Sequence, residues 1–324
     1  MNSFARPKIL ISKCIEFDHC RYDGSMISSK IVEDLKEYVD FVTACPEMAI
    51  GLPSPRESLR LIGSEEDRRL VKSSTGEDYT TKMSSFSQEF LQNNTDGIDG
   101  AILKSKSPSC GIKEVKVYKS HGKVMSLGKS GKGIFGAEVL KYHKNLPIED
   151  EARLGDFTIR ENFLTKIFVL AEFQKIAFNK KIKDLIDFHS RNKYLLMTYN
   201  QSQLKVLGGI IANHDKKSVD QVFTEYKENL LKAFTNNPSY KTKINMLFHI
   251  FGYFSDELNN EEKAFFLDNL ENYRNSKVPF SVPLSVLYSW AIRFNQEYLK
   301  NQRIFKAFPP SLINVTDSGK GRER

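Results

Sequence analysis

Short apolar runs alternate with helical patterns in the first half of the chain. Residues 8–11, 41–44 and 100–103 have the length and apolar content of strands. Residues 27–40 and 80–92 carry apolar positions at the three- and four-residue spacing of amphipathic helices. The order strand, helix, strand, helix, strand predicts an α/β N-terminal domain with a mainly parallel sheet.

The second half carries helical patterns almost exclusively from about Arg160 onward. The predicted helices cover residues 161–178, 181–190, 193–212, 218–235, 240–256, 260–275 and 282–299. We place the domain boundary after residue 146, which gives an α/β domain over 1–146 and an all-α helical domain over 147–324.

Net charge differs between the two halves. The 324 residues carry a formal net charge of +8. Residues 1–150 hold 22 Lys and Arg against 21 Asp and Glu, whereas residues 151–324 hold 26 against 19. The positive excess in the helical half would attract a polyanion such as nucleic acid, with simple solubility as the alternative explanation.

The sequence carries no signal for a membrane or for secretion. No apolar run approaches the roughly 18 residues of a membrane span, and the N-terminal MNSFARPKILISK lacks a secretory apolar stretch. We therefore expect a cytoplasmic protein with no membrane partner. In that reducing compartment the four cysteines are expected to be metal ligands, catalytic groups or packing residues rather than disulfides.

Three of these cysteines follow the three predicted strands in turn. Cys14, Cys45 and Cys110 each come a few residues after a strand, so a parallel sheet would bring their thiols to one edge. The gaps of 31 and 65 residues match no zinc-finger or ferredoxin spacing, and spacing alone favours packing residues. The polar loop sequences Ala-Cys-Pro-Glu and Ser-Pro-Ser-Cys-Gly favour a functional site instead.

Two further features leave alternatives open. Cys20 lies six residues after Cys14 and is either an additional ligand or a packing residue beside the site. Residues 131–136 form the string Gly-Lys-Gly-Ile-Phe-Gly, but not after the first strand, where a dinucleotide site requires it. A helix N-terminus approached by a loop explains this string better, and such a loop could bind an anion.

Several motifs together resemble known families. Those of the first half are Ser12-Lys13-Cys14, Arg21-Tyr22-Asp23-Gly24, Cys45-Pro46-Glu47, Gly51-Leu52-Pro53-Ser54-Pro55-Arg56 and Lys104-Ser105-Lys106-Ser107-Pro108-Ser109-Cys110-Gly111. Residues 8–136 thereby resemble the TudS-type thiouracil desulfidase domain. The strings Arg160-Glu161-Asn162-Phe163-Leu164-Thr165 and Phe188-His189-Ser190-Arg191-Asn192-Lys193, among others, make residues 147–319 similar to the YbgA-type helical domain. The fusion resembles the RudS-type enzymes, which remove sulfur from 4-thiouridine in transfer RNA.

This resemblance implies a [4Fe–4S] cluster held by Cys14, Cys45 and Cys110, with one iron free of any protein ligand. A soft thiocarbonyl sulfur would bind the open iron, which acts as a Lewis acid while water attacks the ring carbon. The implied enzyme is a desulfidase that converts 4-thiouridine of transfer RNA to uridine and hydrosulfide without net electron transfer.

The resemblance also implies two catalytic partners, Glu47 and Ser107. Glu47 would activate water or shuttle a proton, the alternative being a surface carboxylate paired with Lys or Arg. Ser107 would hydrogen-bond the base or the developing anion, the alternative being a turn-stabilising hydroxyl. Further contacts to substrate or cluster are expected from Ser109, Lys104, Arg21, Tyr22 and Asp23.

The basic helical domain would position the RNA, because a thiolated base in folded RNA must be exposed before its sulfur can react. The expected phosphate contacts are Arg191, Lys193, Lys241, Lys243, Arg274 and Arg293, with Tyr194, Tyr199 and Tyr273 available for stacking. No obligatory protein partner is implied.

Two alternative functions stay open. The first is the same chemistry on free thiouracil or another small thioamide, although a free base needs no basic domain. The second is a non-enzymatic, cluster-bearing RNA-binding or sensor protein.

Overall fold

The computed structural model describes residues 4–64 and 67–315. Contacts among the described residues define two compact units, one formed by residues up to 171 together with 311–315, the other by residues 172–310. The division falls inside helix α5 (Phe157–Asn179), later in the chain than the boundary expected after residue 146. Each unit is described by itself.

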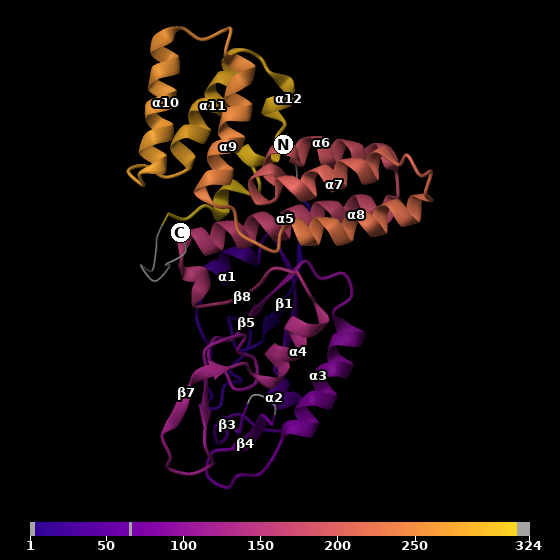
Figure 1. The fold of residues 1–324 in the computed structure, drawn as a ribbon. Coiled ribbons are helices and arrows are strands. Elements are labelled where there is room, and N and C mark those ends of the chain that lie inside the picture. The colour runs from indigo at the N-terminus through magenta and orange to yellow at the C-terminus, as the bar shows by residue number, and fades with distance from the viewer. Residues whose placement is uncertain (1–3, 65–66, 316–324) are drawn as a thin grey trace. The chain divides into compact units, whose positions relative to one another are not determined.

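The first unit is built on a four-stranded parallel sheet, parts of which are labelled in Figure 1. The strand order is β2 (Asp40–Ala44), β1 (Lys8–Ser12), β5 (Gly100–Leu103) and β8 (Ile148–Asp150). All three neighbouring pairs are parallel. The three strands predicted from the sequence and their parallel arrangement are confirmed, and β8 adds a fourth strand just beyond residue 146.

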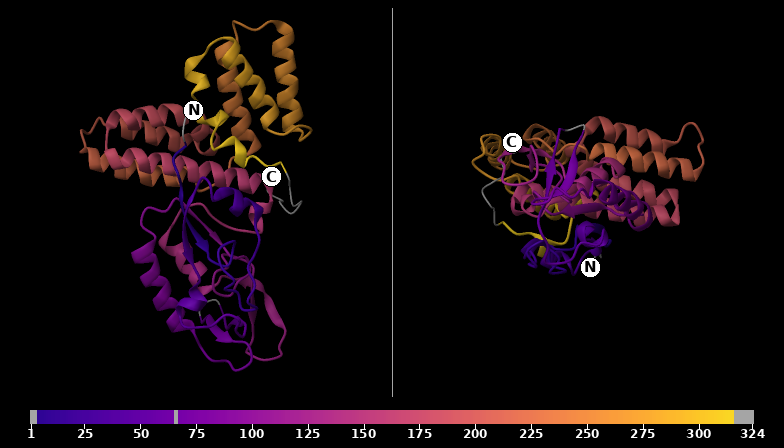
Figure 2. Two further views of the ribbon diagram at one scale, coloured as in Figure 1. Left: turned by 180° about the vertical axis from the view of Figure 1, so that it is seen from behind. Right: turned by 90° about the horizontal axis from the view of Figure 1, so that it is seen from below.

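Helices α3 (Thr80–Asn94) and α4 (Ile134–Tyr142) lie side by side within this unit, as the opposite views of Figures 1 and 2 show. Their buried side chains share one apolar cluster with residues of the sheet, including Leu10, Leu91 and Phe135. Burial of each such side chain stabilises the fold by roughly 1.5–3 kcal/mol. The prediction of a helix over 80–92 is confirmed, whereas the helix expected over 27–40 is only α1 (Lys30–Leu35).

A second four-stranded sheet in this unit was not predicted. Its strand order is β4 (Arg69–Lys72), β3 (Leu59–Ile62), β6 (Val115–Tyr118) and β7 (Ser126–Gly131). Strands β3 and β6 pair in parallel, and the outer strands pair antiparallel to them. Buried Leu61 and Val117 alternate with the outward-facing Arg60 and Lys116, so one face of this sheet packs into the core and the other carries charge.

The second unit is helical, as predicted. Beyond α5 its helices are α6 (Ile182–Tyr199), α7 (Gln201–Ala212), α8 (Val219–Ala233), α9 (Tyr240–Phe251), α10 (Asn260–Arg274), α11 (Ser281–Arg293) and the short α12 (Glu297–Lys300). The helix break expected between 190 and 193 is wrong. The chain breaks at Asn200 instead, whose side chain caps α7 by accepting a hydrogen bond from the Gln203 N–H.

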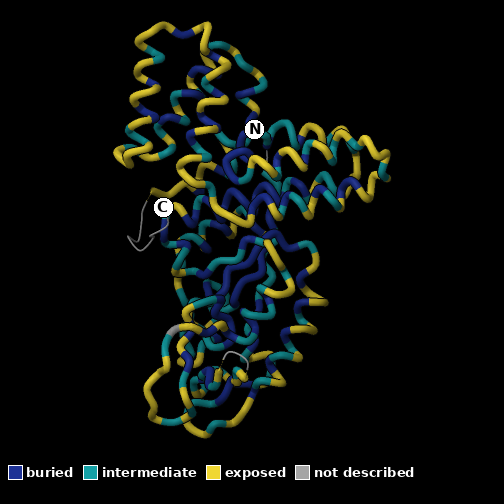
Figure 3. The backbone as a smooth tube through the Cα atoms, in the orientation of Figure 1, coloured by how far each residue is buried: buried dark blue, intermediate teal, exposed yellow. Residues whose placement is uncertain are grey.

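Aromatic side chains fill much of the interior of the helical unit. The ring of Phe173 stacks on that of Tyr226 with 5.5 Å between centroids, and the Phe188 ring meets both edge-on. Figure 3 shows buried positions on the inward faces of these helices and along the strands of the first unit. Among the described helices, none has the length and apolar composition to cross a membrane.

Candidate metal centre

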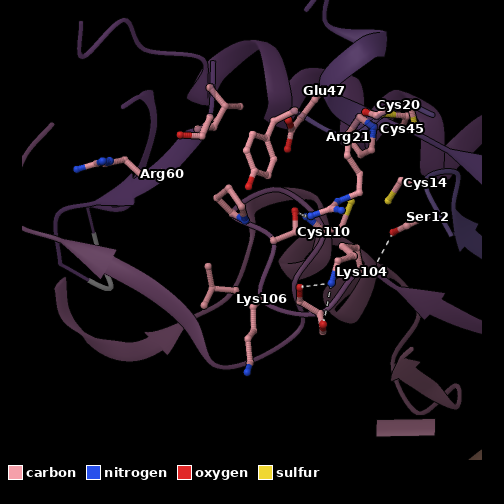
Figure 4. A pocket seen from close by; sticks show the side chains of 18 of the residues that line it. Ser12, Cys14, Cys20, Arg21, Cys45, Glu47, Arg60, Lys104, Lys106 and Cys110 are labelled. Carbon is pink, nitrogen blue, oxygen red and sulfur yellow. Dashed lines mark hydrogen bonds between the residues drawn. The ribbon is translucent and has the colours of Figure 1, made fainter. Parts of the chain in front are cut away.

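The carboxyl ends of β1, β2 and β5 meet at one edge of the parallel sheet. Strand β1 pairs with both β2 and β5, so the three chains leave the sheet as neighbours. Cys14, Cys45 and Cys110 follow these strands and line one cavity of about 480 Å³ (Figure 4). The structure therefore brings together the three thiols that the sequence placed after successive strands.

Cys20, the fourth cysteine, lines the same cavity. Its thiol interacts with those of both Cys14 and Cys45. Cys45 in turn donates through Sγ to the Cys20 carbonyl oxygen at 3.7 Å. Cys20 thus lies beside the other thiols, which agrees with both alternatives that the sequence left open for it.

Three of the thiols, those of Cys20, Cys45 and Cys110, lie in surroundings that favour their protonated form. Burial is the main cause that raises the pKa of Cys110, and a hydrogen bond with Ser12 acts in the opposite direction. Hydrogen bonding with Cys14 is the main cause that raises the pKa of Cys20, to about 11. The pKa of Cys45 is raised chiefly by its hydrogen bond with Cys20 and then by burial. A metal group bound by these sulfurs would have to displace their protons.

The loop that carries Cys110 is shaped by its own serines. The Ser107 hydroxyl oxygen accepts hydrogen bonds from the N–H groups of Ser109 and Cys110, at 3.2 and 3.1 Å. Gly111 closes the turn by donating to the Ser107 carbonyl at 2.9 Å. Ser107 therefore stabilises the turn, as one alternative predicted, and its own O–H is left to face the cavity that the residue lines.

The glycine-rich string of residues 131–136 packs against this loop. Gly133 donates to the Gly111 carbonyl at 2.7 Å, and Gly136 donates to the Ser109 carbonyl at 3.0 Å. A Cβ atom at Gly136 would lie 2.5 Å from the carbonyl oxygen of Cys110. The expectation of an anion site here is wrong, because these N–H groups already bind the cysteine loop.

Glu47 sits in the first turn of the short helix α2 (Pro46–Ala49), directly after Cys45. Its side chain is only 12% exposed. Oε1 accepts a hydrogen bond from the Ser109 hydroxyl at 2.7 Å, and Oε2 forms an ion pair with Arg56 at 2.7 Å. Glu47 is therefore paired with an arginine, as one alternative predicted. It is a partly buried group with both oxygens bonded that lines the cavity, rather than a surface carboxylate.

The motif of residues 51–56 explains how Arg56 reaches this position. Its guanidinium donates to the Cys20 carbonyl through both Nη1 and Nη2, at 3.1 and 3.0 Å. Its backbone N–H donates to the Tyr22 carbonyl at 2.7 Å, and the Ser54 hydroxyl bonds the carbonyls of His19 and Arg21. One segment thus fixes both the Cys20 loop and the Glu47 carboxylate.

The other predicted site residues fall into two groups. Lys104, Arg21 and Tyr22 line the cavity. Ser109 is fully buried beneath Glu47, and Asp23 pairs with Arg21 and the Ser25 hydroxyl, so neither is among the described residues that line it. Sequence reasoning did not single out two lining residues that organise the site, Ser12 and Arg56, although both lie within quoted motifs, and it left the role of Cys20 open.

The residues expected to contact RNA lie on several helices of the second unit. Arg191 pairs with Glu172, Arg274 with Glu271 and Arg293 with Glu262. Lys193, Lys241 and Lys243 lie over the rings of Tyr194, Tyr240 and Phe280. Tyr194 and Tyr199 are buried, so the expectation that their rings are available for stacking is wrong.

Comparison with known proteins places this site in a family. Residues 9–151 match the model of the 2-thiouracil desulfurase family. The chain is 33% identical over 109 residues to the uncharacterized protein YbbK of Bacillus subtilis (strain 168), which covers 32% of this chain and 72% of that protein. The chain belongs to the 2-thiouracil desulfurase family. It is accordingly an enzyme of the desulfidase type, which sets aside the non-enzymatic alternative.

The helical part has relatives of its own. Residues 193–309 match DUF1722, a family described as a protein of unknown function. The chain is 24% identical over 161 residues to the uncharacterized protein YbgA of Escherichia coli (strain K12), across 49% of this chain and 95% of that protein. The resemblance to a desulfidase domain fused to a YbgA-type domain is confirmed.

A solved structure of a [4Fe-4S]-dependent thiouracil desulfidase, TudS, is also similar to this member of the 2-thiouracil desulfurase family. The sequence identity is 26%, and the match covers 46% of this chain and 93% of that one, with a TM-score of 0.36.

Proposed function

We propose that this desulfidase removes sulfur from 4-thiouridine in transfer RNA, using a [4Fe–4S] cluster held by Cys14, Cys45 and Cys110. The observation that carries the proposal is the convergence of these thiols with a partly buried, arginine-paired Glu47 in one cavity. Family membership supports the desulfurase chemistry. The 26 Lys and Arg against 19 Asp and Glu in residues 151–324 support a polyanionic substrate.

The donor set suits an iron–sulfur cluster. Soft thiolates are the ligands that such clusters use, and this cavity gathers thiols from the ends of three strands. Within the described part of the chain, no group of three His, Cys, Asp or Glu side chains is arranged to hold a single metal ion. A cluster occupies more space than one ion, so thiols spread around a shared cavity fit it better than a mononuclear site.

When bound, such a cluster with one open iron supplies a Lewis-acidic, thiophilic site for the thiocarbonyl sulfur. The chain's own residues must then provide and position the water. Glu47 is suited to accept a proton from that water, because Ser109 and Arg56 fix its carboxylate at the cavity wall. The Ser107 hydroxyl is suited to hydrogen-bond the pyrimidine as its charge changes.

The reaction balances without an electron donor. The water oxygen forms a bond to the ring carbon, and the carbon–sulfur bond breaks. One water proton passes to Glu47, the other goes to the sulfur, which leaves as hydrosulfide, and the carbonyl of uridine remains. Arg56 keeps Glu47 oriented throughout, and its own contacts to the Cys20 carbonyl link that orientation to the thiol loop.

A second candidate is the same desulfuration of free thiouracil. The description of the family favours it, since it names 2-thiouracil. The cavity itself could accept a free base, because its volume of about 480 Å³ lies in the range of small-molecule sites.

The two candidates predict different kcat/KM values of the full chain for three substrates. After anaerobic reconstitution with iron and sulfide, turnover is measured on thiolated transfer RNA, 4-thiouridine and 4-thiouracil. The proposal predicts a kcat/KM for the RNA at least about 10-fold above that for the free base, because phosphate contacts contribute binding only there. Equal efficiency would favour the second candidate, and no turnover of any of the three would overturn both.

A further inference from the structure

Helix α9 of the second unit has a buried face and an exposed face. It packs against α6, α10 and α11, the last two visible beside it in Figure 1, and buries four apolar side chains, Ile244, Met246, Leu247 and Ile250. On the other side, exposed positions recur at spacings of three and four residues and continue into the 3-10 turn η2 (Gly252–Phe254). These six exposed residues, which we call the α9 stripe, are Lys241, Asn245, Phe248, His249, Gly252 and Tyr253.

The composition of the α9 stripe differs from that of an ordinary helix surface. The solvent side of a helix is usually occupied by charged residues, and the neighbouring α10 follows this rule with Glu261, Asp268 and Glu271 exposed. The stripe instead combines two aromatic rings with an amide, an imidazole and a glycine, and Lys241 is its only lysine or arginine. It therefore presents flat rings and hydrogen-bonding groups to the solvent.

Acidic residues are absent from this part of the sequence. Residues 229–255 contain Lys232, Lys241 and Lys243 but no Asp or Glu, in a chain with 40 acidic residues among 324. Lys241 forms no salt bridge with the described residues, and its Nζ lies 5.9 Å from the centroid of the Tyr240 ring. An anionic ligand would therefore be attracted by α9 and would meet no carboxylate of this helix.

Tyr253 is held in place by two other tyrosines. The hydroxyl of buried Tyr194 donates a hydrogen bond to the Tyr253 hydroxyl at 3.1 Å. The rings of Tyr253 and Tyr298 stack with 6.2 Å between centroids and 26° between planes. The Tyr253 side chain is still 42% exposed. It thus offers a ring surface whose orientation is already set, so that little ordering is needed when a ligand binds.

Phe248 and Gly252 lie one helical turn apart on the stripe. The Phe248 side chain is 44% exposed, and its ring stacks on no other ring of the described part of the chain. Gly252 has φ of −55°, which any residue adopts, and a Cβ atom there would meet nothing within 4 Å. Neither the backbone nor a neighbour in the chain therefore requires glycine, which lowers stability at a helical position. Its small size leaves the backbone beside the Phe248 ring open to close approach by a ligand.

We propose that the α9 stripe binds unpaired nucleotides of an RNA, with bases stacked on the rings of Phe248 and Tyr253. Stacking on exposed aromatic rings, hydrogen bonds to base edges and neutralised phosphates are the means by which proteins bind single-stranded RNA. Asn245 and His249 supply the hydrogen-bonding groups, and Lys241 supplies the positive charge. The stripe is about 18 Å long from Lys241 to Tyr253, which gives room for more than one nucleotide. This inference rests on the proposed function, in which RNA is the substrate.

Binding of unthiolated transfer RNA to the full chain tests the stripe without any turnover. The affinity is measured by fluorescence anisotropy of a labelled RNA at one fixed salt concentration. Phe248→Ala is expected to weaken binding roughly 5- to 150-fold, the effect of removing one stacking ring. Phe248→Leu is expected to weaken it as well, because leucine keeps the apolar contact but has no flat face. Phe265→Ala, which removes a 58% exposed ring from α10, is the matched control and should leave the affinity unchanged.

Two further variants guard against a folding defect. Gly252→Gln adds a side chain where nothing lies within 4 Å, and glutamine is a better helix former than glycine. The unfolding midpoint of this variant should therefore not fall, whereas its RNA affinity should. Lys241→Gln changes an exposed side chain and is expected to lower the slope of log K against log salt by roughly 0.7.

The outcomes separate this inference from the proposed function. RNA affinity lost in the stripe variants, in a chain that desulfurates no RNA, would support the stripe and reject the function. Native desulfuration of thiolated transfer RNA by Phe248→Ala, with unchanged RNA affinity, would reject the stripe and leave the function standing. Self-association of the native chain that Phe248→Ala abolishes, again with unchanged RNA affinity, would overturn the inference and assign the stripe to a second copy of the chain.

Discussion

Glu47, Arg56 and Ser109 form the polar centre of the site at the scale of single residues. Arg56 is 5% exposed and Glu47 12%, so each charge depends on the other for compensation. Removing Arg56 would leave a carboxylate buried and unpaired, which costs several kcal/mol in comparable settings. The network therefore both stabilises the loop of Cys20 and fixes the direction of the carboxylate.

Replacement of Glu47 by glutamine tests its chemical role. Glu47→Gln keeps the shape and one acceptor oxygen but removes the charge and the proton acceptor. We expect a loss of roughly 10²- to 10⁴-fold in kcat with iron content close to that of the native chain, together with a lower unfolding midpoint because Arg56 loses its counter-charge. Glu37→Gln, at an exposed position of the same unit, serves as the matched control. Retention of full turnover in Glu47→Gln would remove this residue from the mechanism.

The four cysteines are expected to contribute unequally to iron binding. After anaerobic reconstitution the native chain should hold about four irons, and Cys14→Ala, Cys45→Ala and Cys110→Ala should each lose most of them. Cys20→Ala should retain them, although its thiol interacts with two of the proposed ligands. Iron content, measured by absorption spectroscopy, shows which of the four cysteines are needed to hold the cluster. Loss of the cluster in Cys20→Ala would make Cys20 a fourth ligand and close the open iron.

At the scale of secondary-structure elements, the sequence predicted the sheet that carries the thiols. The apolar runs that became β1, β2 and β5 are long enough to be recognised, and the cysteines follow them closely. The second sheet was missed because β3 and β6 alternate apolar residues with Arg60 and Lys116 and therefore form no continuous apolar run. Their alternation, as in Val-Lys-Val-Tyr at 115–118, was the signal that could have revealed them.

The contacts around Glu47 could not be predicted in the same way. Arg56 lies nine residues from Glu47 and Ser109 lies 62 residues away, so only the folded chain brings them together. The sequence indicated that these residues belong to motifs. It could not show that Ser109 bonds Glu47 while Ser107 holds the turn.

Gly136 tests how the start of α4 supports the cysteine loop. A methyl group there would lie 2.5 Å from the Cys110 carbonyl and 2.6 Å from that of Gly111. Gly136→Ala should therefore lower the free energy of unfolding by about 1–3 kcal/mol and reduce iron retention. Gly209→Ala is the control, because nothing lies within 4 Å of its added Cβ and the change in α7 should stabilise by about 0.4–1 kcal/mol. Equal changes of unfolding free energy and of iron retention in the two variants would contradict a supporting role of the start of α4.

His189 in α6 makes the stability of the helical unit sensitive to pH. Its Nδ1 lies 3.0 Å from the Tyr226 hydroxyl, and burial, with a smaller effect of Lys193, lowers its pKa below the ordinary 6.5. Well above pH 6.5 the imidazole is neutral in both the folded and the unfolded chain, so His189 adds no pH dependence to the free energy of unfolding there. Below it the unfolded chain binds a proton that the folded chain resists, and stability falls by at most about 1.4 kcal/mol per pH unit.

Denaturant unfolding between pH 7.5 and 5 measures how steeply the free energy of unfolding changes with pH. His189→Gln should flatten it, whereas His214→Gln, at an exposed loop position, should leave it unchanged. The absolute stability of His189→Gln is not the test, because the substitution also changes a contact with Tyr226. An unchanged slope in His189→Gln would show that another group controls the acid sensitivity.

At the scale of the whole molecule, the excess of positive charge and the candidate site lie in different halves of the sequence. Residues 1–150 are nearly neutral overall, with 22 basic and 21 acidic residues, yet their cavity is lined by six cations. Residues 151–324 carry an excess of 7 positive charges, from 26 basic and 19 acidic residues, although three of the arginines expected to contact RNA pair with glutamates. If the proposed function holds, long-range attraction of the polyanionic substrate would come from the helical half.

The most direct test of the whole account is the fate of 4-thiouridine in transfer RNA. The full chain is reconstituted anaerobically and incubated with thiolated transfer RNA, and the nucleosides and released hydrosulfide are quantified. The account predicts conversion to uridine with one hydrosulfide per base, and no conversion by Cys110→Ala treated in the same way. Conversion by Cys110→Ala at the native rate, or 4-thiouridine left intact by a native chain that holds its full iron, would contradict it.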